Sequence, residues 1–265
     1  MSSCLSLESP LKVSYLGPEG TYTHLATINH FGNSVLSNAF SSVEEVFASV
    51  EKRDSHYGVV PVENSTQGIV SSTLDMFMKS SLKIAGEIEI IINHNMLSKS
   101  DNPSDIKKIY AHPQSFSQCK QWLDKNYADC DKVNAMSNAE AALIASKEKD
   151  SAAIASEAAA DIYGLNMLSK NIQDNQNNST RFLVIGNRDT EPSGNDKTSI
   201  IVSTKNNSGA LYELLKPLSK NNVSMTRIES RPSKHNNWEY LFYLDLDGHI
   251  KDEPLKKANE EIKKE

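Results

Sequence analysis

A repeated alternation of short apolar runs, small polar turns and helix-like stretches starts at Leu11 and limits the possible folds more than any other feature of the sequence. The string LKVSYLG reads as a strand, GPEG as a turn and YTHLATINHF as a helix, and the same order recurs further along. Strands that alternate with helices are typical of layered α/β folds. The pattern therefore predicts an α/β fold with mainly parallel strands.

Three further segments divide this pattern. The apolar run at residues 82–98, LKIAGEIEIIINHNMLS, is longer than an ordinary strand, and we interpret it as a connection from one lobe to another. The Asn-rich segment 170–180 is predicted to be a loop. Residues 187–197 combine Pro, Gly and charges without periodicity and are the best candidate domain boundary. We therefore predict a two-lobed domain at 11–188 and a second domain at 197–265.

The second domain is predicted to have the element order β-α-β-β-α. Its expected strands lie at 198–204, 224–232 and 240–249, and its expected helices at 209–222 and 253–265.

Charge and composition exclude several classes of partner. The 265-residue chain has a net charge of -6, so it lacks the positive surplus that a nucleic acid or an anionic membrane requires. No run approaches the roughly 20 apolar residues that span a bilayer, and MSSCLSLESPLK does not resemble a signal peptide. We expect a cytoplasmic protein that binds a small ligand.

The cysteines and histidines do not suggest a metal site. Cys4, Cys119 and Cys130 contain no CxxC pair, as expected of unpaired thiols in a reducing compartment. The seven histidines contain no HxxxH pair. The sequence predicts no metal.

Four predicted strand-to-helix junctions share one chemistry. They are residues 17–21, 63–66, 112–115 and 137–140. Several helix N-termini that converge on one cleft bind an anion through unpaired N–H groups, without many cationic side chains. Each junction has a plainer interpretation, in which Asn64, Ser65 and Ser115 cap helices and Ser137 and Glu140 form a capping box.

Read together, these strings resemble prephenate dehydratase with a C-terminal ACT regulatory domain. Four strings are similar to motifs of the catalytic domain: GPEGTYTHLA, GVVPVENSTQG, AHPQSFSQC and DNQNNSTRF. Two further strings, GALYELL and RIESRP, are similar to the phenylalanine-binding segments of the ACT domain. The resemblance implies a bilobed catalytic domain like a type II periplasmic binding protein, followed by a ferredoxin-like α+β ACT domain. It also implies that prephenate is converted to phenylpyruvate, with loss of water and carbon dioxide and without a cofactor.

The resemblance also implies site residues. The catalytic candidates are Thr180, Arg181 and Phe182: Thr180 as the hydrogen-bond donor to the leaving hydroxyl, Arg181 as a carboxylate anchor or a brace, and Phe182 as apolar wall or core. The substrate-binding candidates are Thr21, Glu63, Asn64, Ser65, Gln114, Ser115 and Asn178. Glu63 is ambiguous, because its carboxylate would repel a dianionic substrate unless it is protonated or turned away.

For the second domain the resemblance implies phenylalanine as the effector and a homodimer or homotetramer. The effector-binding candidates are Gly209, Ala210, Leu211, Glu229, Ser230, Arg231 and Pro232. An ACT domain usually closes with a further strand, whereas this sequence stops inside the expected second helix, so we expect a truncated domain with an open sheet edge.

Two alternative functions share these features. Arogenate dehydratase has the same fold and motifs but acts on the transaminated substrate. A non-catalytic small-anion binding protein has the same bilobed fold, and a fold alone does not determine function.

Overall fold

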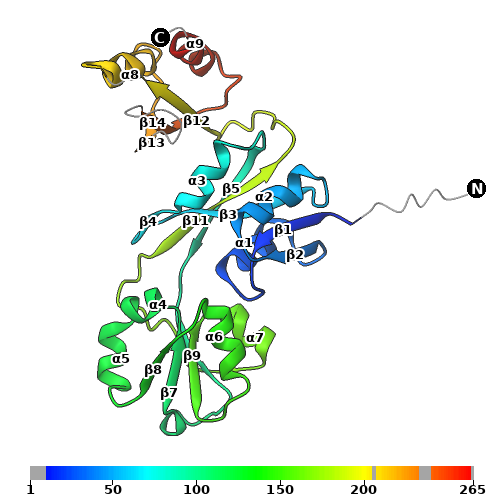
Figure 1. Ribbon diagram of the computed structural model, residues 1–265, viewed down its shortest axis with the longest axis vertical. Helices are drawn as coiled ribbons and strands as arrows, with labels where there is room; N and C mark the ends of the chain where they lie inside the picture. The colour runs from blue at the N-terminus through cyan, green and yellow to red at the C-terminus, as the bar shows by residue number, and fades with distance from the viewer. Residues whose placement is uncertain (1–9, 205–206, 233–239, 264–265) are drawn as a thin grey trace, which may run out of the picture. The chain divides into compact units, whose positions relative to one another are not determined.

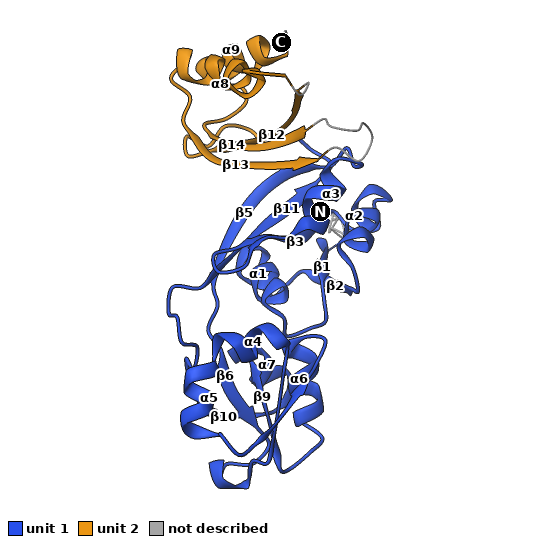
Figure 2. Cartoon of the chain, turned by 60° about the vertical axis from the view of Figure 1, so that its left-hand side comes forward, with its two compact units in different colours: residues 1–189 blue, residues 190–265 orange. Residues whose placement is uncertain are grey.

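The structure is a computed structural model that describes residues 10–204, 207–232 and 240–263. Residues 1–9 lie outside the described residues, and they include Cys4 and most of the string considered for a signal peptide. The last two residues of the expected terminal helix lie outside them as well. The chain divides into two compact units, residues 1–189 and 190–265 (Figure 2).

The first lobe of the first unit is built on a mixed sheet. Its strand order is β2-β1-β3-β11-β5, and β4 pairs with the other side of the end of β3. The strands are β1 (Lys12–Leu16), β2 (Leu36–Phe40), β3 (Tyr57–Asn64), β4 (Gly68–Ile69), β5 (Lys83–Ile91) and β11 (Ser179–Gly186). Helix α1 (Tyr22–Phe31) packs against β1, β3 and β5, whereas α2 (Val43–Glu51) packs against α3 (Ser71–Phe77) as well as β1 and β3.

The second lobe of the first unit has its own five-stranded sheet, ordered β10-β6-β9-β7-β8. Its strands are β6 (Asn95–Ser98), β7 (Lys108–Ala111), β8 (Asp131–Asn134), β9 (Ser151–Ala155) and β10 (Asn166–Ser169). Its helices are the 3-10 helix η1 (Pro103–Asp105), α4 (Pro113–Gln118), α5 (Lys120–Asn126), α6 (Asn138–Ala145) and α7 (Glu157–Tyr163).

The prediction of mainly parallel strands is wrong for both lobes. β1 is parallel to β2 and β3, and β7 is parallel to β8 and β9. However, β11 lies antiparallel between β3 and β5, and β6 is antiparallel to β9 and β10. The physical reason is the path of the chain, which enters the second lobe through β6 and returns to the first lobe through β11 (Figure 1).

The long apolar run 82–98 joins the lobes, as predicted. It forms β5 in the first sheet and β6 in the second, with residues 92–94 as the connection between them. Residues 170–178 form the return connection, and the predicted Asn-rich loop lies there. The chain therefore crosses between the lobes twice, and Thr180 follows directly after the second crossing.

Small residues allow the second lobe to pack closely. Helix α6 presents Ala141, Ala142 and Ala145 to a cluster that includes Ala153 of β9, all 0% exposed. Methyl side chains permit the helix backbone to approach the strand, so packing here depends on short side chains rather than on large ones.

The second unit has the predicted order β-α-β-β-α. Strands β12 (Lys197–Thr204), β13 (Met225–Pro232) and β14 (Tyr240–Asp247) form an antiparallel sheet ordered β12-β14-β13. Helices α8 (Ala210–Lys220) and α9 (Glu253–Ile262) contribute Leu214, Leu218, Leu255 and Ala258 to its core.

Within the described ranges, no helix is both long enough and apolar enough to cross a membrane. Among the same residues, no group of three or more His, Cys, Asp or Glu side chains is arranged to hold a metal ion. Cys119 and Cys130 are free thiols, and burial raises the pKa of Cys119 to about 12.

Candidate active site

Thr180 lies at the start of β11, half-buried and directly opposite Asn64 of β3 in the strand register. The Asn64 side-chain amide donates a hydrogen bond to the Thr180 hydroxyl, with Nδ2 2.8 Å from Oγ1. No acceptor among the described residues takes the proton of the Thr180 hydroxyl. The hydroxyl oxygen is therefore held from one side while its O–H remains available to a ligand.

Asn64 organises the turn that follows β3. Its Oδ1 accepts hydrogen bonds from the backbone N–H groups of Thr66 and Gln67, each at 3.1 Å, and from the Thr66 hydroxyl at 2.7 Å. This geometry is an Asx-type turn, in which an asparagine side chain replaces backbone partners. The prediction of a strand-to-helix junction at residues 63–66 is wrong, because Glu63 and Asn64 end β3, residues 65–67 form the turn to β4, and α3 starts only at Ser71.

Ser65 and Asn178 join the same cluster. The Ser65 hydroxyl accepts a hydrogen bond from the N–H of Ser179 at 2.9 Å, and Asn178 Oδ1 accepts one from Asn64 Nδ2 at 2.9 Å. The side chain of Asn178 is almost fully buried, and its Nδ2 has no hydrogen-bond partner among the described residues. Four of the predicted residues, Asn64, Ser65, Asn178 and Thr180, are thus brought together by direct contacts.

Strand β3 has a bulge next to this cluster, where the register between β3 and β11 shifts by one residue. Thr180 pairs with Asn64 and Arg181 with Glu63, but Phe182 pairs with Pro61, so Val62 is the extra residue. Proline has no N–H for a sheet ladder and occurs in strands at edges or bulges. Bulges increase local twist and redirect neighbouring side chains. The bulge at Pro61 and Val62 therefore lies directly beside the pairing that holds Thr180.

Arg181 is held between two glutamates. Its guanidinium contacts Glu63 on β3 at 2.8 Å and Glu87 on β5 at 2.6 Å, and its side chain is 20% exposed. These pairs tie the three strands together, so the structure places Arg181 as a brace and not as a free carboxylate anchor. Glu63, predicted as a substrate contact, is turned to this ion pair.

Phe182 is a core residue, one of the two positions predicted for it. Its side chain is 2% exposed and lies in a cluster with Val13, Tyr15, Val59 and Ile88. Since side chains alternate along a strand, Thr180 and Phe182 share one face of β11 and Arg181 lies on the other.

The other predicted substrate residues lie outside this cluster. Thr21 is the N-cap of α1: its hydroxyl accepts from the N–H of His24 at 3.3 Å and donates to the Pro18 carbonyl at 2.9 Å. Ser115 is 2% exposed, and its hydroxyl exchanges hydrogen bonds with the side chain of Asn138 on α6 at 3.0 and 2.8 Å. Gln114 lies in the first turn of α4, half-buried, with its N–H bonded to His112.

Two residues that were not predicted from the sequence are connected to the cluster by hydrogen bonds. Gln118 of α4 donates from Nε2 to the Thr66 hydroxyl at 3.1 Å, and its Oε1 lies 2.7 Å from Nε2 of His94. Gln118 falls one helical turn after Gln114 within the AHPQSFSQC string, so helical spacing was a usable signal. His94 is a single histidine in the apolar run 82–98, and burial lowers its pKa.

The residues predicted to bind an effector lie at two positions of the second unit. Gly209 is the N-cap of α8 and Ala210 begins it, while residues 229–232 end β13. A side chain at Gly209 would meet no atom within 4 Å, but its φ is +87°. The backbone conformation therefore favours glycine there.

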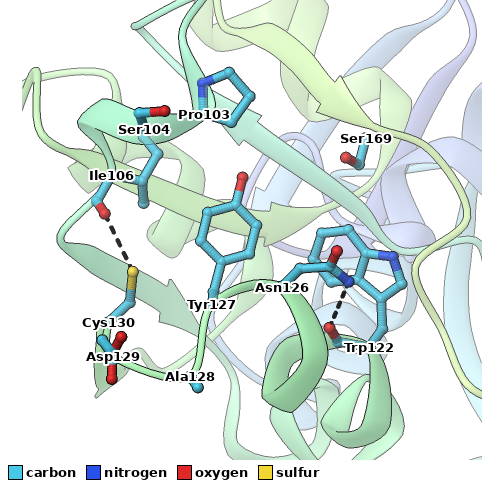
Figure 3. Close-up of a pocket in the computed structure, with 10 residues that line it drawn as sticks. All are labelled: Pro103, Ser104, Ile106, Trp122, Asn126, Tyr127, Ala128, Asp129, Cys130 and Ser169. Atoms are coloured by element: carbon cyan, nitrogen blue, oxygen red, sulfur yellow. Dashed lines mark hydrogen bonds between the residues drawn. The ribbon is translucent and has the colours of Figure 1, made fainter.

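A separate hollow of about 490 Å³ lies on the second lobe, beside α5 (Figure 3). Trp122 and Tyr127 form part of its wall, with Ile106 and Cys130 on another side. None of the predicted catalytic or substrate-binding residues lines this hollow, so it is not the candidate active site.

Comparison with known proteins agrees with this geometry. The family model for prephenate dehydratase matches residues 13–190. A bifunctional chorismate mutase/prephenate dehydratase from Pseudomonas aeruginosa is 49% identical over 269 residues, which cover 100% of this chain and 73% of that protein.

Two solved structures are similar over nearly the whole chain. A prephenate dehydratase from Arthrobacter aurescens in complex with L-Phe has a TM-score of 0.88 and 30% identity, covering 96% of this chain and 86% of its own. GqqA, described as a novel type of quorum quenching acylase, has a TM-score of 0.85 and 26% identity, covering 95% of this chain and 92% of its own. The family model and the identity to the Pseudomonas aeruginosa protein show that the chain belongs to the prephenate dehydratase family.

Proposed function

We propose that this chain converts prephenate to phenylpyruvate and that Thr180 is the hydrogen-bond donor to the leaving hydroxyl. One observation carries the proposal: Asn64 Nδ2 donates to Thr180 Oγ1 at 2.8 Å, while the Thr180 proton has no acceptor among the described residues. A hydroxyl that already accepts a hydrogen bond is a stronger donor, because hydrogen bonds in a chain polarise one another.

Prephenate carries a hydroxyl and a carboxylate at opposite ends of a cyclohexadiene ring. In the reaction the ring C–O bond breaks and its electron pair leaves with the hydroxyl oxygen, which gains a proton and departs as water. The ring–carboxylate bond breaks to release carbon dioxide, and its electrons complete the aromatic ring. A donor aimed at the departing oxygen stabilises the charge that develops there.

An alcohol is too weak an acid to protonate hydroxide by itself at neutral pH, so Thr180 acts as a positioned donor within a relay. One feature of the cluster suits an anionic substrate. Asn178 Nδ2 is a buried donor, and leaving such a group unpaired costs about 1–3 kcal/mol, which a ligand oxygen would recover.

The direct test is to incubate the purified protein with prephenate and follow phenylpyruvate by its absorbance. Side-by-side kinetics with arogenate decide between the two dehydratases. Because GqqA shares the fold, an acyl-homoserine lactone serves as a third substrate, and a non-catalytic binding protein would transform none of the three. A higher kcat/KM for prephenate than for the other two supports the proposal, and any other order refutes it.

We further propose that the second unit binds phenylalanine as an effector at a homodimer or homotetramer interface, in a cytoplasmic enzyme. The Arthrobacter aurescens relative was solved with L-Phe, which supports this assignment. Phenylalanine is expected to change both turnover and melting temperature, with Arg231→Ala weakening both effects. Titration that alters neither property, or a monomer in sedimentation with phenylalanine present, would count against it.

A further inference from the structure

A row of hydrogen bonds runs from His94 to Thr180 and joins the two lobes. His94 Nε2 lies 2.7 Å from Gln118 Oε1, and Gln118 Nε2 donates to Thr66 Oγ1 at 3.1 Å. The Thr66 hydroxyl donates to Asn64 Oδ1 at 2.7 Å, and Asn64 Nδ2 donates to Thr180 Oγ1 at 2.8 Å. Gln118, Thr66 and Asn64 each accept on an oxygen and donate from a nitrogen or a hydroxyl. With His94 Nε2 as the first donor, all four bonds point toward Thr180.

The surroundings of His94 suit it to begin this row. Its side chain is 1% exposed, and its backbone N–H is fixed by Gln173 Oε1 at 2.9 Å. Burial lowers its pKa, so the ring is neutral and carries one N–H. The Tyr22 hydroxyl donates to the Asn93 carbonyl at 2.6 Å and lies 3.2 Å from Nδ1. Gln118 Oε1, 2.7 Å from Nε2, can only accept a hydrogen bond, so the single ring proton is assigned to Nε2.

We propose that His94 is a positioning residue for the dehydration: through Gln118 and Thr66 it orients Asn64 and strengthens the Thr180 hydroxyl as a donor. This rests on the proposed role of Thr180. Gln118 belongs to the second lobe and Thr66 to the first, so the bond between them completes the row only when the lobes have the arrangement described here. His94, in the connection between β5 and β6, belongs to neither sheet.

The test separates kcat from KM. His94→Leu removes the donor with little change of volume and is expected to lower kcat about tenfold, with KM changed less than about threefold. His94→Gln keeps an amide donor near the position of Nε2 and is expected to restore most of kcat. His249→Leu is the matched control, since His249 is 6% exposed with both ring nitrogens in hydrogen bonds but lies in the second unit. It is expected to leave dehydratase kcat unchanged.

A double-mutant cycle tests the chain itself. Thr66→Val removes the hydroxyl from an exposed residue, so it remains informative even if His94→Leu does not fold. If the row acts as a unit, the double variant loses no more kcat than either single variant. Unchanged kcat in both single variants, or losses that simply multiply, would overturn the role of His94. Failure of the proposed function has a different signature, in which the wild-type protein forms no phenylpyruvate or Thr180→Ala keeps its turnover.

Discussion

Arg181 shows how a predicted site residue can serve the sheet instead of the ligand. Its guanidinium lies between carboxylates on two neighbouring strands, Glu63 and Glu87, which are 29% and 34% exposed. Removing the cation would leave two acidic side chains without their shared partner. Partly buried charges that lose a partner are destabilising because their desolvation is no longer offset.

We therefore expect Arg181→Met to lower the free energy of unfolding by about 2 kcal/mol, less than for a fully buried pair, while KM for prephenate stays near normal. Urea denaturation and steady-state kinetics measure the two quantities. Arg181→Lys keeps the charge but not the two-pronged contact and should fall between wild type and Arg181→Met. A large rise in KM with unchanged stability would instead make Arg181 a carboxylate anchor.

The motifs identified the central residues of the site, but not the partners that hold them. Short sequence motifs predicted four residues that are joined by hydrogen bonds in the structure: Asn64, Ser65, Asn178 and Thr180. Ser115 and Phe182 belong to the same motifs but are buried in the interior, because a motif preserves packing as well as chemistry. His94 was not predicted, since its contacts depend on how two lobes fold together.

At the scale of elements, β3 contains a glycine, Gly58, that leaves no room for a side chain. A side chain at Gly58 would place its Cβ 2.8 Å from Val46 Cγ1 and 2.9 Å from Ile185 Cγ1. Both neighbours are branched and well packed, so neither can move away easily.

Gly58→Ala is therefore expected to destabilise the protein by about 1–3 kcal/mol through overpacking. Gly86→Ala on β5 is the matched control, because its nearest neighbour would be 3.4 Å away, an ordinary contact. Thermal or urea unfolding compares the two variants. Equal stability of both would show that the α2 and β11 contacts with Gly58 are looser than described.

Element type was largely predictable, whereas pairing direction was not. Hydrophobic periodicity identified α1, β3, β11 and the order of the second unit, because each pattern is local. The antiparallel insertion of β11 between β3 and β5 depends on the return of the chain from the second lobe, which no local pattern encodes. The turn at residues 63–66 was assigned to a helix for a related reason, since capping residues also favour turns.

At the scale of the whole molecule, buried neutral histidines link stability to pH. Burial lowers the pKa of both His24 and His94, which are 4% and 1% exposed. In the unfolded chain each has a pKa of about 6.5, so below that pH the unfolded state binds more protons than the folded state. Their contribution to stability is therefore complete above about pH 6.5 and is lost as the pH falls toward the lower folded values.

Lowering the pH from 7.5 to 5.5 should reduce the free energy of unfolding, by at most about 1.4 kcal/mol for each histidine, the limit set by the unfolded pKa of about 6.5. Urea denaturation at the two pH values measures this change, and His94→Gln should reduce the difference. If His94→Gln has the same pH dependence as wild type, His94 does not contribute through its protonation.

The connection between two lobes was predicted from the long apolar run, which forms the first crossing, and the segment predicted only as an Asn-rich loop forms the second. Those crossings bring residue 64 and residue 180 into direct contact. The account of function depends on that contact and on the hydroxyl that it leaves free to donate.

The turnover of Thr180 variants with prephenate tests this most directly. Thr180→Ala should lower kcat about a hundredfold or more with a smaller effect on KM, as expected for the loss of one transition-state donor, and Thr180→Ser should retain most of the activity. A correctly folded Thr180→Ala protein that forms phenylpyruvate at nearly the wild-type rate would contradict the central claim.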